Sequence, residues 1–238
     1  MRGCLFTLAL AAVVVALIVV VGLPAVAAGL LTAGVRAGGL EAADTVVTVT
    51  ADPPWDLLEL RADRVRVRAT HATFRGLQIG ALDVTLLDVS VLGRTAGGVE
   101  GRLTGVTVPD VAGQPLGLGA IDLAGGGDRV TASTTIAAAD ARSLVAAEIA
   151  TVTGVDVPAT AVRLVPPDKV VVSEGLSVTA TLSVDAAGNI VATAPGLPPV
   201  TLLRAGEDVP ISFTSVRVVD SAGDLALAGI LEVALLGG

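Results

Sequence analysis

Apolar and polar positions follow different periods in different parts of this chain, and each period predicts a different kind of element. Residues 3–35 contain no charged side chain, and Leu5 to Leu23 form a nineteen-residue apolar run. Such a run suits a helix that crosses the hydrocarbon core of a bilayer, which takes about 20 residues. From Thr45 onward the apolar period changes to two, which is typical of half-buried β-strands.

The uncharged N-terminal run has two interpretations that the sequence leaves open. It is either a retained membrane helix or a secretory signal peptide cleaved near Ala27, where small residues form a cleavage site. The apolar region of a signal peptide is usually about 15 residues at most, which favours the anchor. We therefore expect residues 1–34 as anchor or signal, residues 35–44 as a tether and residues 45–238 as an extracytoplasmic β-rich domain. If cleavage occurs, the domain is secreted or periplasmic.

Two neighbouring strands show the alternation most clearly. The apolar face of the first holds Val65, Val67 and Ala69, and its opposite face holds Arg64, Arg66 and Arg68. In the second, Leu82, Val84 and Leu86 share one face. Apolar residues continue with the opposite parity from Leu87, which predicts a β-bulge at that point.

Other ranges alternate in the same way and are bounded by glycine and proline. The further strands are expected at residues 45–51, 99–108, 116–123, 129–136, 159–165, 169–173, 176–185, 190–194, 211–219 and 225–236. One clear helix is expected, with Asp140 capping its first turn and Gly154 ending it. The predicted fold class is mainly β with one or two short helices (α+β).

The composition adds two observations. Hydrophobic residues make up 53% of the chain but aromatic residues only 2%, so a core of valine, leucine and alanine is either thin or encloses something other than protein. The alternative explanation for the shortage of aromatic residues is a genome biased toward alanine, glycine, valine and arginine codons. Without Arg2 the chain has 14 basic and 23 acidic residues, a net charge of 14 − 23 = −9. This balance argues against nucleic acid as a partner.

The residue types that carry chemistry are scarce. The chain has one histidine, His71, which we assign to a strand, and one cysteine, Cys4, at the start of the apolar run. No Gly-x-Ser-x-Gly motif accompanies the histidine, and no metal-ligand spacing is present. The sequence therefore specifies no enzyme, no metal and no cofactor.

A cluster of arginines stands out from this background. Five of the fifteen basic residues fall between Arg61 and Arg75. Arg64, Arg66 and Arg68 project from one strand face, where they either bind a phospholipid head group or pair with nearby carboxylates on a solvated surface. Trp55, after two prolines, is either a membrane-interface anchor or a partly buried core residue.

Several hydrophobic motifs occur in an order that resembles a known family. Pro53-Pro54-Trp55-Asp56-Leu57-Leu58 is followed by the Val65-Arg66-Val67 strand, then Gly76-Leu77-Gln78-Ile79 and Leu82-Asp83-Val84-Thr85-Leu86, and a late alanine- and valine-rich helix. This arrangement resembles the LmeA-like phospholipid-binding proteins of actinobacterial cell envelopes. The resemblance implies an elongated twisted sheet or half-barrel around a helix, similar to tubular lipid-binding domains, with a long apolar cavity. A phospholipase activity associated with that family has no matching residues here.

The function that this resemblance implies is non-catalytic binding, with or without transport, of a phospholipid or another acyl-chain lipid. The expected partners are membrane lipid and, through the N-terminal helix, the membrane itself. Residues from the apolar faces of the strands are expected to line the cavity: Val65, Val67, Leu82, Val84, Leu86, Val178, Leu182, Val216 and Val218. The alternatives are a structural or adhesive domain without a ligand and, least favoured, a lipid esterase that uses a serine with His71.

Overall fold

A computed structural model of the chain describes residues 40–74, 76–93, 95–126, 129–219 and 222–232. The predicted anchor or signal peptide, the cleavage site near Ala27, Cys4 and Arg75 lie outside these residues. Within the described part, no helix combines the length and the apolar character needed to cross a bilayer.

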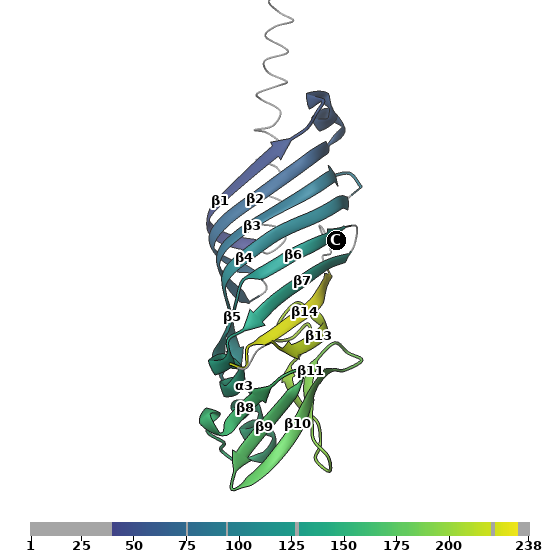
Figure 1. Cartoon of the computed structure of the whole chain (residues 1–238). Coiled ribbons are helices and arrows are strands. Elements are labelled where there is room, and N and C mark those ends of the chain that lie inside the picture. The colour runs from purple at the N-terminus through teal and green to yellow at the C-terminus, as the bar shows by residue number, and fades with distance from the viewer. Residues whose placement is uncertain (1–39, 75, 94, 127–128, 220–221, 233–238) are drawn as a thin grey trace, which may run out of the picture.

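The described residues form two antiparallel sheets and one α-helix in an elongated molecule (Figure 1). The nine-stranded sheet has the order β1 (Leu40–Thr50), β2 (Arg61–Phe74), β3 (Leu77–Ser90), β4 (Thr95–Val111), β6 (Ile121–Gly126), β7 (Arg129–Ile136), β14 (Leu225–Glu232) and β13 (Ser212–Val218), with β5 (Gln114–Leu118) paired to β4. The five-stranded sheet has the order β12 (Val200–Leu203), β11 (Ile190–Thr193), β10 (Leu176–Val184), β9 (Lys169–Glu174) and β8 (Val162–Val165). The predicted mainly β class is confirmed, and neither sheet closes on itself.

Most predicted strands are present, with differences at their ends. β7 has the predicted bounds, whereas the range 116–123 is divided between β5 and β6. β1 begins at Leu40, which pairs with Phe74, so residues 40–44, expected in a tether, belong to the sheet. The short strand β12 was not predicted, because it has only four residues and follows two prolines.

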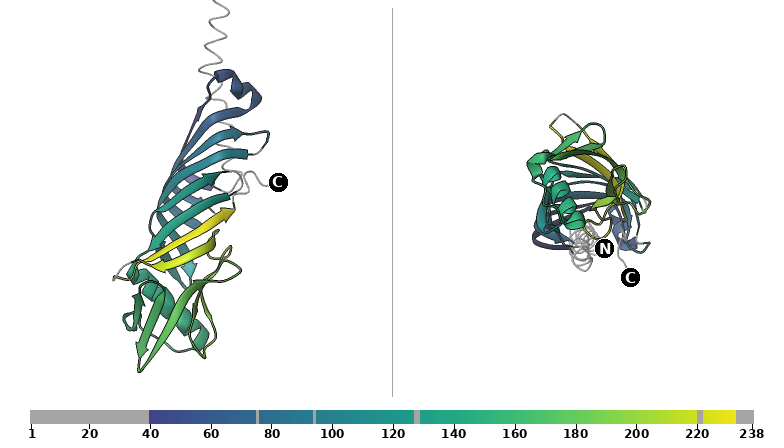
Figure 2. Two further views of the ribbon diagram at one scale, coloured as in Figure 1. Left: turned by 45° about the vertical axis from the view of Figure 1, so that its right-hand side comes forward. Right: turned by 90° about the horizontal axis from the view of Figure 1, so that it is seen from below.

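The helix α3 (Ala138–Thr153) shows that one expected cap was wrong and the other correct. Its N-cap residue is Ala137, and the Ala138 N–H donates to the carboxylate of Asp224, 2.9 Å away, so Asp140 is not the cap. At the other end Gly154 has a φ of 70° and donates its N–H to the Ala150 carbonyl oxygen, as predicted. The helix packs against β12, β8, β5 and the short 3₁₀ helix η3 (Ala159–Ala161), at the end of the molecule where the two sheets meet (Figure 2).

The predicted bulge at Leu87 is absent, and a reversal of the pleat takes its place. Leu87 pairs with Arg64 and Val89 pairs with Ala62, so no residue is inserted between β2 and β3. Asp88, between them, has a φ of 49°, and the buried face changes from the parity of Leu86 to that of Val89. A second reversal crosses the sheet at His71 and Gly105, which also have positive φ.

Two apolar clusters divide the core. The larger cluster joins α3 to both sheets and contains Ile136, Leu144 and Leu225, all nearly inaccessible. The smaller one, which we call the sheet-end cluster, lies at the β1–β4 end and comprises Val49, Leu57, Ala62, Val65, Val67, Val89 and Ala96. Its members come from β1–β4 and from the 3₁₀ helix η2 (Pro54–Glu59), with no described residue of the second sheet among them.

Candidate functional site

The apolar face of the nine-stranded sheet is built from rows of side chains that the strand register aligns. We call this surface the inner face. Its three central rows are Val49–Val65–Leu86–Val99, Val47–Val67–Val84–Gly101–Leu123 and Ala69–Leu82–Leu103–Ile121. Each row crosses at least four neighbouring strands, so the face is continuous from β1 to β6.

Five of the nine predicted cavity residues meet on the inner face. Val65 lies opposite Leu86, Val67 opposite Val84, and Leu82 opposite Ala69. Val65 and Val67 are buried, whereas the three residues of β3 are half-buried. The register thus places the predicted residues of β2 and β3 side by side.

The other four predicted cavity residues lie elsewhere. Val216 and Val218 belong to β13, at the opposite edge of the same sheet, and Val218 is buried in the larger cluster. Leu182 and Val178 belong to β10 in the second sheet, where Leu182 is buried in the larger cluster and Val178 is exposed. These four residues are therefore separated from the β2–β3 set.

The opposite, outer face of β2 and β3 carries the arginines. Arg66 donates from Nε and Nη2 to the two carboxylate oxygens of Asp83, at 2.8 and 2.6 Å, and Arg68 Nε lies 3.3 Å from Asp83 Oδ2. The hydrogen bonds from Arg66, together with its charge and that of Arg68, lower the pKa of Asp83. Two of the three predicted head-group residues are thus already engaged by a carboxylate, as expected for a solvated ionic surface.

This ionic contact continues across the sheet as alternating charges. Arg68 lies opposite Asp83, Asp83 opposite Arg102, and Arg102 opposite Asp122, with Arg102 Nε 3.6 Å from the Asp122 carboxylate. Opposite charges on facing strands favour this register over a slipped one. Arg64 is exposed and makes no ion pair with another described residue. Of the three predicted head-group arginines, it is therefore the one whose charge is available to a ligand.

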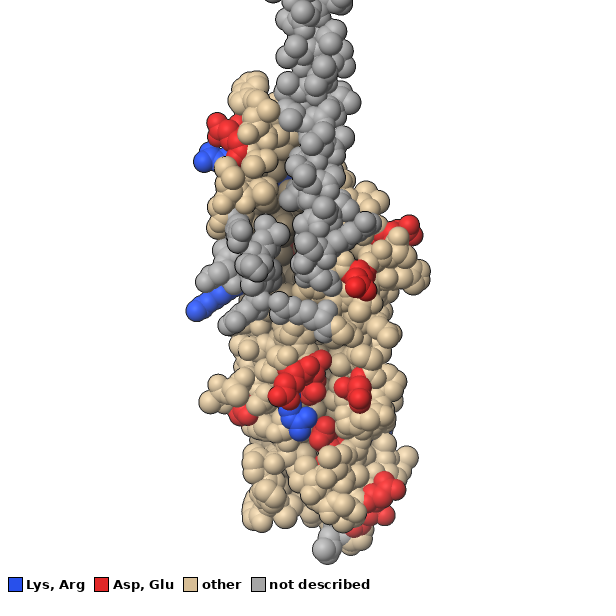
Figure 3. Space-filling view, turned by 180° about the vertical axis from the view of Figure 1, so that it is seen from behind, with Lys and Arg blue, Asp and Glu red and all other residues tan. Residues whose placement is uncertain are grey.

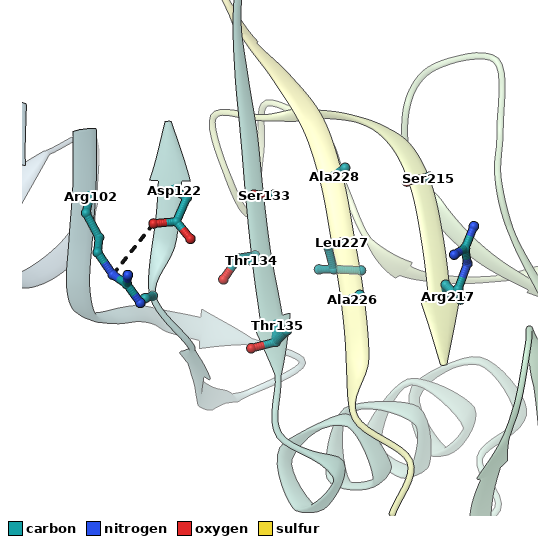
Figure 4. A pocket seen from close by; sticks show the side chains of 11 residues that line it. Arg102, Asp122, Ser133, Thr134, Thr135, Ser215, Arg217, Ala226, Leu227 and Ala228 are labelled. Atoms are coloured by element: carbon teal, nitrogen blue, oxygen red, sulfur yellow. Dashed lines mark ion pairs between the residues drawn. The ribbon is translucent and has the colours of Figure 1, made fainter. Parts of the chain in front are cut away.

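A shallow depression of about 560 Å³ lies further along the outer face (Figure 4). Its floor holds small side chains such as Ser133, Ser215 and Ala228, and Arg102 and Arg217 stand at its two sides. These arginines lie on β4 and β13, four strand spacings or about 19 Å apart. They are too far apart to bind one phosphate together. The sequence analysis did not predict this depression, because no local pattern brings β4 and β13 into one sheet.

Groups suited to catalysis do not gather in the described part of the chain. His71 is exposed on β2, and no set of three or more His, Cys, Asp or Glu side chains within the described ranges is placed to hold a metal ion. Seen from behind, the described surface carries more acidic than basic side chains (Figure 3).

Comparison with known proteins adds no identification. No family model, curated protein or solved structure matches the chain. The described residues therefore define a mainly β protein with an open nine-stranded sheet and a smaller second sheet.

One buried carboxyl group gives a testable pH dependence. Glu148 on α3 is 4% exposed, and burial raises the pKa of its carboxyl group, with Arg204 opposing the effect and Asp208 adding to it. Because the pKa of Glu148 is higher in the folded than in the unfolded protein, the protonated carboxyl group favours folding. The stability associated with this protonated form is fully present below the unfolded pKa, about 4.3, and is lost as pH rises through the folded-state pKa.

We therefore expect Glu148→Gln to raise Tm at pH 7.5 by a few degrees and to change it little at pH 4. For a domain of this size about 1 kcal/mol corresponds to roughly 2–4 °C. Thermal unfolding of full-length protein at both pH values measures the effect, with Glu174→Gln, an exposed site on β9, as the matched control. An equal effect of Glu148→Gln at both pH values would contradict the burial argument.

Proposed function

We propose that this protein binds a phospholipid, or another acyl-chain lipid, without catalysis on the inner face of the β1–β4 end, in the cell envelope. One observation carries the proposal. The described members of the sheet-end cluster all come from a single sheet and the short helix η2 that follows β1. The second sheet contributes no described residue to this apolar layer, and we infer that a lipid packs against it instead. A second protein layer from β8–β12 lies at the other end of the molecule (Figure 2).

The size of the inner face suits acyl chains. β3 has 14 residues, which extend over about 46 Å at about 3.3 Å per residue. One leaflet of a bilayer has a hydrocarbon depth of about 15 Å, half of the roughly 30 Å core. A lipid tail therefore fits along the strand direction with its full length against protein.

The side chains of this face leave room for such a tail. Valine, alanine and leucine dominate it, and these side chains fill less volume than aromatic rings. Burial contributes about 0.8 kcal/mol per CH₂, so a sixteen-carbon chain offers roughly 13 kcal/mol before the costs of ordering it. The open sheet also fits the half-barrel implied by the resemblance to LmeA-like proteins, but the expected position of the helix inside it was wrong, because α3 packs against β5, β8 and β12.

Photo-crosslinking tests the proposal at the level of residues. Full-length protein is reconstituted with a phospholipid that carries a diazirine at the end of one acyl chain, irradiated and digested. We expect adducts on β2 and β3, in peptides that contain Val67 and Val84, and few on β9 and β10 in the second sheet. Lipid attached only to residues 5–23 would favour the structural or adhesive alternative.

A further inference from the structure

One end of the molecule exposes large apolar side chains on two adjacent loops. Trp55 and Leu58 of η2 are 63% and 64% exposed, and Leu92, in the turn between β3 and β4, is 75% exposed. Leu60, directly after η2, is also exposed. We call these four residues the apolar tip.

The two loops of the apolar tip are tied together by the backbone. The Val91 N–H donates to the Leu60 carbonyl oxygen at 2.9 Å, which places the turn that carries Leu92 against the end of η2. Leu60 itself has a φ of 56°, a left-handed conformation that a leucine rarely adopts. Its N–H donates back to the carbonyl oxygens of Asp56 and Leu57, so the loop is held in this shape.

The apolar tip is continuous with the inner face. Leu57, between Trp55 and Leu58 in η2, is buried in the sheet-end cluster with Val65 and Val67. The tip lies at the end of the long axis opposite the five-stranded sheet (Figure 1). A surface that meets the tip therefore also meets the end of the inner face.

The length of the chain that precedes β1 indicates which surface this is. The apolar run that ends at Leu23 suits a bilayer, and sixteen residues separate it from Leu40, a reach of at most about 58 Å. β1 carries the chain about 33 Å from Leu40 to Thr50, next to η2. The apolar tip is thus within reach of the membrane that the run would occupy.

The charges around the tip select the kind of membrane. Asp52, Asp56, Glu59 and Asp63 flank the exposed side chains of η2 along the chain, and among the described residues only Glu59 is paired with an arginine, Arg61, at 3.6 Å. These four carboxylates outnumber Arg61 and Arg64, the described arginines at the same end of β2, so an anionic surface would repel this end of the molecule. A zwitterionic surface lets the apolar side chains insert without that opposition.

We propose that the apolar tip docks on a zwitterionic phospholipid bilayer, with Trp55, Leu58 and Leu92 inserted at its interface. This part of the proposal rests on the proposed function: lipid passes between the bilayer and the inner face at this contact, next to Leu57. Tryptophan is suited to this depth, because one part of its ring is apolar and its N–H can stay hydrated, and the leucines add apolar area.

Trp55 is the only tryptophan of the chain, so its fluorescence reports on the tip directly. Full-length protein is reconstituted in phosphatidylcholine vesicles in which part of the lipid carries brominated acyl chains. We expect bromine to quench at least about half of the Trp55 emission at both 0.1 M and 0.5 M salt, because insertion is apolar. Vesicles that contain phosphatidylserine should give weaker quenching at low salt.

Two double variants separate docking from mere proximity. Leu58→Ser with Leu92→Ser should lose most of the quenching, whereas Val155→Ser with Leu197→Ser removes two exposed apolar residues outside the tip and should lose none. Unquenched Trp55 in the reconstituted wild type, or equal quenching in the two double variants, overturns the docking proposal.

The quenching and the crosslinking experiments together distinguish this proposal from the proposed function. Unquenched Trp55 together with crosslinked lipid on β2 and β3 would refute the tip and leave lipid binding in place. Strong quenching without adducts on those strands would refute lipid binding and leave docking in place.

Discussion

Replacing Val84 by aspartate is expected to remove most of the bound lipid while leaving the protein folded. Val84 is half-buried at the centre of the inner face, between Val67 and Gly101 on the neighbouring strands. A carboxylate placed against an acyl chain costs several kcal/mol, and each 1.4 kcal/mol corresponds to a tenfold loss of affinity. We therefore expect the yield of lipid crosslinks on β2 and β3 to fall at least about tenfold.

The matched control places the same charge on the other side of the sheet. Thr104→Asp lies on the exposed outer face of β4 and should leave both crosslinking and Tm nearly unchanged. Crosslinking yield and thermal unfolding are measured on all three full-length proteins. If Val84→Asp lowers Tm strongly and leaves the lipid yield as in the wild type, Val84 belongs to a filled protein core and the lipid-binding proposal fails at this face.

The strand pairs of the first half were accessible from the sequence because their signals are local. The alternation of Val65 and Val67 with arginines defines two faces, and the next strand supplies Leu82 and Val84 at the same period. A short connection then leaves antiparallel pairing as the natural arrangement. The register brought the predicted inner-face residues of these two strands together.

The positions of β13 and β14 were not accessible in this way. The chain leaves the nine-stranded sheet after Ile136, builds α3 and the whole second sheet, and returns at Ser212 to pair β14 with β7. Nothing near residues 212–232 indicates a partner almost one hundred residues earlier. Val216 and Val218 were therefore grouped with Val65 by parity alone, although five strands lie between them.

The hydrophobic pattern of the sequence also could not predict which charged side chains pair with one another. Asp83 lies inside an apolar strand, and only the register shows that it faces both Arg66 and Arg68. The pleat reversals at His71 and Asp88 required positive φ values at residues that rarely adopt them, which no local composition signals. The place of Trp55 and Leu58, in contrast, can be derived once β1 and β2 are paired, because both residues lie in the connection between these strands.

Gly229→Ala is expected to be strongly destabilising, because β13 bends close to β14 at this glycine. Gly229 lies opposite Phe213, where the β13–β14 register shifts. A Cβ atom there would contact the side chain of Ile211 and would lie 2.6 Å from the Ser212 carbonyl oxygen. The backbone oxygen cannot rotate away as a side chain can, so the strands would have to separate.

Overpacking of this kind costs typically 1–3 kcal/mol, and for a backbone contact we expect about 3 kcal/mol, a fall in Tm of roughly 6–12 °C. Gly117→Ala on β5 is the matched control in the same sheet, because its added Cβ would meet only the carboxylate end of Asp140, at 3.2 Å. That flexible side chain can move, and alanine restricts the unfolded chain more than glycine does, so we expect no loss of stability there. Thermal unfolding of the two full-length variants compares them directly. Similar Tm values for both would mean that β13 does not approach β14 as closely as the register shift at Phe213 requires.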